Sequence, residues 1–432
     1  MEAQYQGDNV LILADDFTGA NDAAVNFALN GAQAMVMFHP ENVPQAQVVA
    51  VNTDSRALAA NQAEQAIKAA INTVGLPGHS HWLVKKIDST LRGNPGAEVS
   101  AALQASGLAG AVVALASPGL GRTTTNGQCL VKGIPVNQTE FASDPKTPVT
   151  DADIIHVLQQ QAERVCYLAD LACVRQGNLA ATLQACFARG VEVVVVDSET
   201  APDLTRVIEA VASLPVRPLL AGSAGICEAL AQYLFPLAAT SPLLPHSSGP
   251  LLAVVGSMSE IAQQQMQAVM QHPLVTHMAL SAEQALSADS ESYLHECVQA
   301  AVAALNSGRH CVISTTEHHD ARHQVARLCQ RYQLNRAQLG EKLCLFLGRL
   351  TQAILSDATP GGMYLSGGDV AIAVARVLGA QGFTIHGRIA ECVPWGEFTG
   401  SQYLRPVMTK AGGFGNTDTL LEVVHFFEEK TK

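Results

Sequence analysis

Short apolar runs of strand length alternate with segments of helical periodicity along the first half of the chain. Runs such as Val10–Ala14 and Val48–Asn52 are almost wholly apolar, which is typical of strands buried on both faces of a sheet. The segments between them, such as Leu58–Val74, repeat apolar residues at helical spacing. This alternation predicts βα units and a largely parallel sheet. Further strands are expected at Ala34–Phe38, Trp82–Lys86, Ala111–Ala116 and Val191–Asp197, and a further helix at Ala97–Ser106.

Two segments interrupt the alternation. Gly121–Val136 is rich in Thr, Asn and Gly, which predicts a β-hairpin or flap rather than a helix. Residues 241–250 contain three prolines and three serines directly before a new apolar run, which predicts a linker between domains. We therefore expect an N-terminal domain over residues 1–240 and a C-terminal domain over residues 251–432.

Beyond the linker the same alternation of strands and helices begins again. A chain of 432 residues also exceeds the size at which one hydrophobic core keeps growing. The sequence therefore predicts an α/β fold with two Rossmann-like domains, each with a largely parallel sheet, and an active-site cleft between them. The elements expected in the second domain are strands at Leu251–Val255, His310–Thr315 and Met363–Leu365, and helices near Ile261–Met270, Tyr293–Leu305, Val370–Leu378 and Thr419–Glu428.

Composition narrows the class of protein. Hydrophobic residues make up 48% of the chain and charged residues 15%, which indicates a globular enzyme rather than a disordered chain. The net charge of −12 disfavours nucleic acid as a partner. The sequence has ten cysteines without a Cys-x-x-Cys pair, no signal-peptide pattern at the N-terminus and no apolar stretch of membrane-spanning length. These features predict a reduced, cytoplasmic protein that does not associate with membranes.

A glycine-rich turn, Thr409–Asp418, lies near the C-terminus between an apolar run and the start of a helix. Glycines let backbone N–H groups approach an anion closely, and a helix N-terminus favours phosphate oxygens. Lys410 adds a mobile cation beside the turn. The turn is therefore either a phosphate cradle or only a tight connection between a strand and a helix.

Acidic residues follow the first predicted strand. Asp15, Asp16 and Asp22 lie at or just beyond its C-terminal end, the edge at which open α/β sheets bind ligands. An ionised carboxylate accepts hydrogen bonds from neighbouring hydroxyls, and one beside a nucleophilic hydroxyl can act as a general base. In the alternative reading, Asp22 only caps the following helix and the other two residues are solvated parts of a turn.

Cationic residues follow two other strands of the same predicted sheet. Lys86, Asp88 and Arg92 come at and after the end of one strand, and Arg56 follows another. An arginine can hold a carboxylate through its planar fork, and a lysine can do so as a point charge. Asp88 and Arg92 can equally pair with each other. Loops of this kind converging at one sheet edge predict a site for a small hydroxy acid.

The second domain offers three strand-to-helix junctions rich in small residues, at Gly256-Ser257, Ser366–Asp369 and Lys410–Gly415. A Gly-Gly-Asp turn can expose backbone donors to phosphates. Its aspartate, Asp369, either approaches Mg²⁺, which prefers hard oxygen ligands, or caps the following helix. The sequence contains no Gly-x-x-x-x-Gly-Lys-Ser/Thr segment, which excludes a P-loop protein.

Six segments, taken in order, resemble the signature blocks of the four-carbon acid sugar kinases. The resemblance implies that the N-terminal domain binds the sugar acid, that the C-terminal domain binds ATP, and that the product is the 4-phosphate of a tetronate. D-threonate is the acceptor expected first, with D-erythronate and 3-oxo-tetronate as alternatives. The six segments, which extend over nearly the whole chain, are Ala14–Asp22, Lys86–Asn94, Ala221–Gly225, Gly256-Ser257, Ser366–Asp369 and Thr409–Gly415.

The resemblance and the residue pattern together suggest roles for individual side chains. We expect Asp16, Lys86 and Arg92 to be catalytic, with Asp15 and Asp16 binding substrate hydroxyls and one of them acting as base. The cofactors expected are ATP and Mg²⁺, with Asp369 at the metal. The predicted substrate site comprises Asp15, Asp16, Arg56, Lys86, Asp88, Ser89 and Arg92. The predicted nucleotide site comprises Ser257, Ser366, Gly367, Gly368, Asp369, Lys410, Gly412 and Gly413.

Other classes of function stay open. A non-catalytic nucleotide or metabolite sensor would keep the glycine-rich loops but would transfer nothing. A dehydrogenase is disfavoured because no Gly-x-Gly-x-x-Gly segment follows the first strand of either domain. His318, His319 and His323 are disfavoured as a metal site, since no His-Glu-x-x-His pattern or nearby Cys pair accompanies them. The segment Ala221–Gly225 resembles a turn at the start of a helix.

A homodimer is a possible assembly of this chain.

Overall fold

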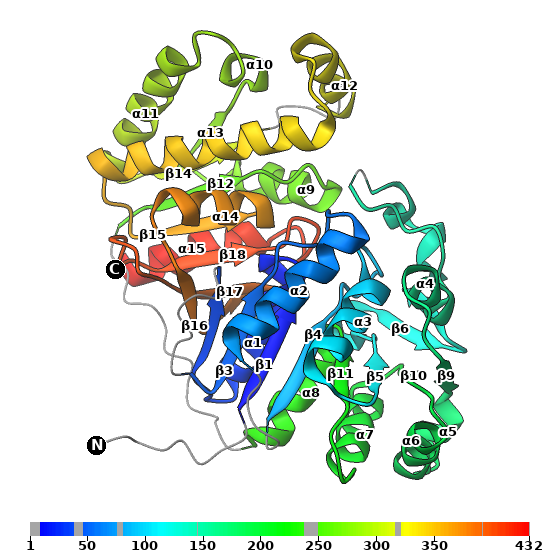
Figure 1. Ribbon diagram of the computed structural model, residues 1–432. Coiled ribbons are helices and arrows are strands. Elements are labelled where there is room, and N and C mark those ends of the chain that lie inside the picture. The colour runs from blue at the N-terminus through cyan, green and yellow to red at the C-terminus, as the bar shows by residue number, and fades with distance from the viewer. Residues whose placement is uncertain are drawn as a thin grey trace. The chain divides into compact units, whose positions relative to one another are not determined.

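The computed structural model describes residues 9–38, 46–75, 81–144, 146–236, 249–315, 321–390 and 392–431. The chain divides into two compact units, an N-terminal unit, Met1–Thr240, and a C-terminal unit, Ser241–Lys432. Each unit is a sheet flanked by helices (Figure 1). The linker predicted at 241–250 lies outside the described residues, apart from Gly249 and Pro250.

The N-terminal unit contains a parallel sheet with the strand order β2-β3-β1-β4-β11-β5-β10-β9. Its first strand, Val-Leu-Ile-Leu-Ala, is buried along its whole length, as a strand covered on both faces must be. The strands are β1 (Val10–Ala14), β2 (Ala34–Met37), β3 (Val48–Asn52), β4 (Trp82–Lys86), β5 (Ala111–Ala114), β9 (Cys166–Ala169), β10 (Val193–Val196) and β11 (Leu219–Gly222).

Helices cover both faces of this sheet. Helix α1 packs against α8 and α8 against α7, whereas α2 packs against α3 and α3 against α4. The right-handed crossovers of parallel βαβ units place these two groups on opposite faces. The helices are α1 (Phe17–Leu29), α2 (Ala60–Val74), α3 (Pro95–Ser106), α4 (Ile154–Gln161), α5 (Leu171–Arg175), α6 (Leu179–Ala188), α7 (Ala201–Ala212) and α8 (Ala224–Leu234).

A small antiparallel sheet follows β5. Its strands are β6 (Arg122–Thr125), β7 (Gln128–Val131) and β8 (Ile134–Pro135), so the predicted hairpin at Gly121–Val136 is confirmed. Asn126 and Gly127 join β6 to β7 with φ angles of 52° and 73°, the left-handed pair that a two-residue hairpin turn requires. Three short 3-10 helices, Pro118–Leu120, Val136–Gln138 and Glu140–Ser143, flank this sheet.

The C-terminal unit contains a mixed sheet with the order β13-β14-β12-β15-β18-β17-β16. The first five strands are parallel, and β17 runs antiparallel to both of its neighbours. The largely parallel α/β fold predicted from the sequence is therefore confirmed. The strands are β12 (Leu251–Val255), β13 (Val275–Ala279), β14 (His310–Ser314), β15 (Gly362–Ser366), β16 (Gly382–Ala390), β17 (Val393–Thr399) and β18 (Val407–Lys410).

Helices also flank the second sheet in two groups. Helix α13 packs against α11 and α14, whereas α9 packs against α15. The helices are α9 (Glu260–Val269), α10 (Ala282–Ala285), α11 (Ser290–Asn306), α12 (Ala321–Tyr332), α13 (Arg336–Asp357), α14 (Gly368–Val377) and α15 (Thr419–Thr431). No helix in the described part of the chain is both long enough and apolar enough to cross a bilayer.

The structure departs from the predicted elements at their boundaries and also contains elements that the sequence analysis did not name, among them strands β9, β11 and β13 and helices α4, α6 and α7. Strands β2, β5 and β10 are shorter than their apolar runs, because the outer apolar residues of each run continue into the connecting turns. The antiparallel pair β16 and β17 and the long helix α13 have no counterpart among the predicted elements.

Candidate active site

Three strands of the N-terminal unit end at the same level of its sheet. Ala14, the last residue of β1, pairs with Asn52 at the end of β3 and with Lys86 at the end of β4. The residues that follow these strands therefore emerge at one edge, as the sequence predicted. This register brings together the loops that carry Asp15, Arg56 and Asp88.

Arg56 links the acidic residues of this edge. Its Nε lies 2.6 Å from Asp15 Oδ2 and its Nη2 lies 3.0 Å from Asp15 Oδ1. The same guanidinium donates to both oxygens of Asp16, through Nη1 at 2.9 Å and Nη2 at 2.8 Å. A third carboxylate is also near, since Asp88 Oδ1 lies 3.7 Å from Arg56 Nη2. A planar fork with five donors can hold two carboxylates in this way, which a lysine ammonium cannot do.

Asp16 is the N-cap of α1. It accepts hydrogen bonds from the Gly19 amide at 2.8 Å and from the Thr18 hydroxyl at 2.6 Å. A Cβ atom at Gly19 would lie 2.5 Å from Asp16 Oδ1 and 3.5 Å from Lys86 Nζ, so only glycine allows this close approach. The alternative in which Asp22 caps the helix is wrong, because Asp22 lies inside α1.

Asp88 and Arg92 form the pair considered from the sequence. Arg92 donates to Asp88 through Nε at 2.9 Å and Nη2 at 3.0 Å, and its Nη1 lies 3.3 Å from Asp144 Oδ2. Asp88 also accepts from the Thr90 hydroxyl. Both members therefore have protein partners, and a role for Arg92 in binding a substrate carboxylate stays a prediction.

The two neighbouring lysines of β4 have different surroundings. Lys85 is fully buried, lies 2.9 Å from Glu98 and donates to the carbonyls of Leu13 and Lys86. Lys86 Nζ donates to the Ile87 carbonyl at 2.9 Å and lies on the side of Asp16 and Gly19. Successive residues of a strand point to opposite faces, so one lysine is structural and the other reaches the site.

Arg122 is a member of the site that the sequence analysis missed. It begins strand β6, is buried, and its Nη1 donates to the hydroxyl of Ser89. Its guanidinium lies 5.7 Å from the centre of the Phe141 ring, and that of Arg92 lies 5.4 Å from the same ring. The nearest sequence signal was the arginine at the start of the predicted hairpin, but nothing in the pattern indicated that it reaches the β4 loop.

Charge and burial act differently on the carboxylates of this site. Burial raises the pKa of Asp15, but Arg56, Lys85 and Lys86 outweigh it and lower that pKa below its usual value. Burial likewise opposes the effect of Arg92 and Arg56 at Asp88, whose pKa is held well below its usual range.

Asp22 behaves in the opposite way. Burial raises the pKa of Asp22 to about 6, the nearby charge of Asp16 adds to this, and Lys86, Arg122 and Arg56 offset it only in part. Its carboxylate makes no hydrogen bond or ion pair with the described residues. A carboxyl group that titrates near neutral pH beside cationic side chains is suited to accept a proton.

The predicted nucleotide loops of the C-terminal unit lie side by side. The Gly256 amide donates to the Ser366 carbonyl at 3.0 Å, and the Gly367 amide donates to the Lys410 carbonyl at 2.9 Å. Ser259 Oγ donates to the Gly412 carbonyl at 2.7 Å. The structure therefore brings the loops after β12, β15 and β18 together at the carboxyl edge of their sheet.

Lys410 shapes the glycine-rich loop rather than acting as the mobile cation expected from the sequence. Its side chain is buried, and its Nζ donates to the carbonyls of Ala411, Gly412 and Phe414 at 2.8, 3.1 and 3.1 Å. The amides of Gly412 and Gly413 donate to no group in the described part of the chain. The loop thus directs its carbonyls toward an ammonium group and leaves N–H donors for an anion.

Helix α14 begins beside this loop. Its N-cap is Gly367, which has a φ of 109° and supplies no side chain to the helix N-terminus. Asp369 is exposed and is the second residue of the helix, and the alternative in which it is the N-cap is wrong because Gly367 holds that position. An exposed carboxylate in the first turn of a helix is a hard oxygen donor that fits Mg²⁺.

The turn Ala221–Gly225 spans the end of β11, whose last residue, Gly222, pairs with Lys86. Ser223 caps α8, and a Cβ atom at Gly222 or Gly225 would collide with the carbonyl of Ala114 or Ala116. The turn Ala221–Gly225 is therefore explained by close packing. His318 and His319, and the side chain of His323, lie outside the described residues.

Comparison with known proteins gives a description for each of the two domains. Residues 10–230 match a family described as a sugar-binding N-terminal domain, and residues 252–420 match one described as a nucleotide-binding C-terminal domain. A D-threonate kinase of Salmonella typhimurium is 40% identical over 97% of this chain and 98% of its own length. A D-erythronate kinase of Heliobacterium modesticaldum is 30% identical over 98% of both.

Solved structures extend the comparison to the fold. A Haemophilus influenzae protein superimposes with a TM-score of 0.73 at 25% identity, over 96% of this chain and all of its own. A Salmonella typhimurium protein superimposes with a TM-score of 0.80 at 23% identity. The match covers 96% of this chain and 98% of that protein, which shows that the two share a fold.

The matched domains define a protein with one sugar-binding and one nucleotide-binding domain, and its curated relatives are kinases. The chain belongs to the four-carbon acid sugar kinase family. It is therefore a phosphotransferase with an alcohol group as acceptor, and ATP is the phosphoryl donor that its kinase relatives imply.

Proposed function

We propose that the chain transfers the γ-phosphoryl group of ATP to the terminal hydroxyl of D-threonate and yields D-threonate 4-phosphate. The observation that carries this choice is the 40% identity to a D-threonate kinase over nearly the full length of both chains. Identity falls to 30% for the D-erythronate kinase and to 26% for a 3-oxo-tetronate kinase of Haemophilus influenzae. These two acids are the alternative acceptors.

The chemistry of the N-terminal site supports a sugar acid as acceptor. Such a molecule presents hydroxyls and one carboxylate, so it needs both acceptors and cations. The side chains of Asp15 and Asp16 are hydrogen-bond acceptors whose orientation is fixed by Arg56. Lys86, Arg92 and Arg122 supply positive charge for the substrate carboxylate or the transferring phosphoryl group.

Asp22 is our candidate for the general base, although the sequence analysis favoured Asp16. Asp16 already accepts hydrogen bonds from Thr18, Gly19 and Arg56, which occupy its oxygens and stabilise its charge. The carboxylate of Asp22 has no such partner among the described residues and interacts electrostatically with Lys86 and Arg122. We therefore assign Asp16 to positioning and Asp22 to removal of the hydroxyl proton.

The nucleotide would bind at the C-terminal loops. The amides of Gly412 and Gly413, which donate to no described group, and the N-terminus of α14, whose N-cap glycine has no side chain, suit the phosphates. Ser257, Ser366 and Gly368 belong to the same group of loops. Asp369 would hold Mg²⁺, which neutralises phosphate charge when bound. The side chain of Lys410 keeps the loop in shape and therefore acts on the nucleotide indirectly.

The first test is an ADP-release assay with ATP and Mg²⁺ against a panel of acids. The panel holds both enantiomers of threonate and of erythronate, 3-oxo-tetronate, glycerate and a pentonate. Selective ADP release with D-threonate is the expected result, and preference for another tetronate would correct the acceptor but keep the kinase. ATP binding without release on any acid would favour the non-catalytic sensor instead.

We also propose that the protein works in the cytoplasm and forms a homodimer. The ten cysteines are all free in the structure, which supports a reducing compartment. Light scattering of the purified chain measures its mass directly, and a monomeric mass would contradict the dimer.

A further inference from the structure

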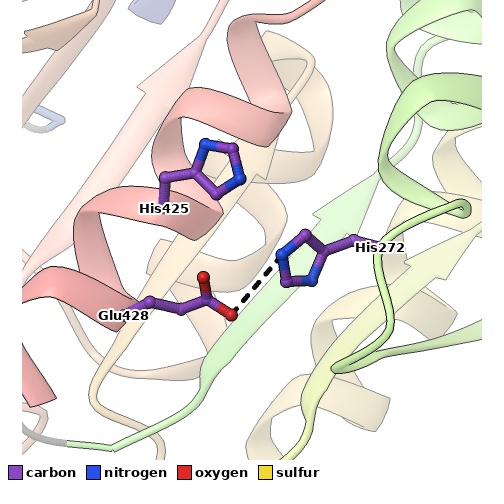
Figure 2. A group of neighbouring side chains, drawn as sticks. All are labelled: His272, His425 and Glu428. Carbon is purple, nitrogen blue, oxygen red and sulfur yellow. Dashed lines mark ion pairs between the residues drawn. The ribbon is translucent and has the colours of Figure 1, made fainter.

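Three potential metal ligands meet in the C-terminal unit, and none of them is among the predicted nucleotide residues. His272 lies between α9 and β13, and His425 and Glu428 lie one turn apart on α15. Figure 2 shows both α15 side chains on the side of the helix that faces the loop carrying His272. The potential ligand atoms all lie within 4.8 Å of one another, and no other such group occurs among the described residues.

The spacing of these groups is close to that of a metal site. His272 Nε2 lies 3.5 Å from Glu428 Oε1, and the rings of His272 and His425 are 5.5 Å apart between centres. Ligand atoms bound at about 2.0–2.1 Å around a tetrahedral zinc ion lie roughly 3.4 Å from one another. The pair His272 and Glu428 already has this separation, and His425 needs only a change of side-chain rotamer because it is exposed.

A fourth side chain, that of His310, lies next to one of these ligands, Glu428. Its Nδ1 accepts a hydrogen bond from the Leu251 amide at 2.9 Å, so its neutral ring carries the proton on Nε2. That Nε2 lies 3.8 Å from Glu428 Oε1. This separation exceeds hydrogen-bond distance, so His310 is a polar neighbour of the carboxylate rather than a ligand, and a small shift would let its N–H donate to Glu428 as outer-shell partners of metal ligands do.

We propose that His272, His425 and Glu428 bind one zinc ion, with water at the fourth position and His310 supporting Glu428. Imidazole and carboxylate ligands suit Zn²⁺, whereas Mg²⁺ prefers oxygen ligands and does not compete at such a site. Glu428 Oε1 is buried without a hydrogen-bond partner in the described part of the chain, which a bound cation would satisfy.

The position of the site indicates what the ion does. His310 is the first residue of β14, whereas the nucleotide loops follow the last residues of β12 and β15. The zinc site thus lies at the amino edge of the sheet, opposite the loops proposed to bind nucleotide. The ion ties α15 to the connection between α9 and β13, and its role is structural rather than catalytic.

Zinc binding is tested on the untagged full-length protein after treatment with a chelator and dialysis. Titration calorimetry with Zn²⁺ alone is expected to give one equivalent bound, and Co²⁺ in its place is expected to give the visible absorption of a tetrahedral site. Because metal binding stabilises the folded state, zinc should also raise the melting temperature.

Variants assign the binding to these side chains. His425→Ala and Glu428→Gln are each expected to weaken zinc binding at least tenfold and to abolish the rise in melting temperature. His295→Ala, which removes an exposed histidine on α11 in the same unit, is the matched control and should bind as the wild type does. Absence of stoichiometric binding, or binding that His425→Ala and Glu428→Gln leave unchanged, would overturn the proposal.

Discussion

Arg56 holds Asp15 at two points, with Nε 2.6 Å from one carboxylate oxygen and Nη2 3.0 Å from the other. The same guanidinium also pairs with Asp16, so a single side chain fixes two adjacent carboxylates. This arrangement makes the geometry of the acceptor site depend on one arginine.

Replacing Arg56 by lysine should test that dependence. A point charge cannot reproduce four hydrogen bonds, so the carboxylates of Asp15 and Asp16 repel each other and shift. We expect kcat/KM to fall roughly 100-fold, the size of loss that a displacement of about 1 Å produces. Arg349→Lys, at an exposed pair with Glu291, is the control and should change neither kinetics nor stability. Unchanged kcat/KM in Arg56→Lys would contradict this account.

Asp22→Asn should remove the proposed base. The pKa of Asp22 is raised to about 6, so in the wild type kcat/KM should fall tenfold for each pH unit below 6 as the base becomes protonated. The variant should lose roughly 100-fold to 10,000-fold in kcat and lose this acid limb. Asp16→Asn should keep the limb while it removes the charge that pairs with Arg56. A pH–rate profile measured for all three proteins distinguishes the two residues.

The same substitution should stabilise the fold. A carboxyl whose folded pKa is raised above its unfolded value favours the folded state below the unfolded pKa, and this contribution is lost as pH rises through 6. Asp22→Asn should therefore match the wild type near pH 4 and exceed its free energy of unfolding by about 1–3 kcal/mol above pH 7. Urea denaturation at several pH values measures the free energy of unfolding of both proteins. If Asp22→Asn is less stable than the wild type at pH 8, the buried charge of Asp22 does not destabilise the fold.

Gly412→Ala should damage the nucleotide site. A Cβ atom there would lie only 2.6 Å from Ser257 Cβ, so the loops after β12 and β18 must separate. We expect the KM for ATP to rise roughly tenfold or more, because misplaced donors lose their contacts with the phosphates. The matched control is Gly340→Ala in α13, where nothing lies within 4 Å of the added atom. Equal KM values for the two variants would show that the loop packing does not matter.

Lys410→Met should destabilise the C-terminal unit as well as weaken ATP binding. The substitution leaves the carbonyls of Ala411, Gly412 and Phe414 without their buried donor. The expected loss of stability is about 2–5 kcal/mol, measured by chemical denaturation. Lys342→Met, at an exposed position on α13, should have little effect. Wild-type stability in Lys410→Met would mean that the loop does not need the ammonium group.

Much of the fold could be predicted because buried parallel strands are nearly pure apolar runs. The register of β1, β3 and β4 then follows, and with it the convergence of Asp15, Arg56 and Asp88 at one edge. The hairpin at Gly121–Val136 was also predictable, since Asn126-Gly127 encodes its turn. The pair β16 and β17 was not predicted from the sequence. The register of these two strands shifts twice along their length, so their apolar and polar residues do not alternate regularly.

The partners of individual side chains were much harder to predict. Lys410 is the last residue of β18, where a lysine is usually solvated, and only the path of the following loop turns three carbonyls toward it. Arg122 reaches Ser89 from a part of the chain 33 residues away. Asp16 rather than Asp22 caps α1 because the helix begins at Phe17, and helix boundaries are the least certain part of any sequence pattern.

The small sheet of β6, β7 and β8 is separate from the parallel sheet that forms the core of the N-terminal unit. It carries Arg122 to the acceptor site, and Phe141 of the 3-10 helix that follows packs against the same guanidinium, yet none of its strands belongs to the parallel sheet. If the proposed site is correct, substitutions in this small sheet are expected to change what the site recognises without disturbing the strand pairing of the main sheet. Evolution within the family therefore has a route to new acceptors in which the core sequence is left intact.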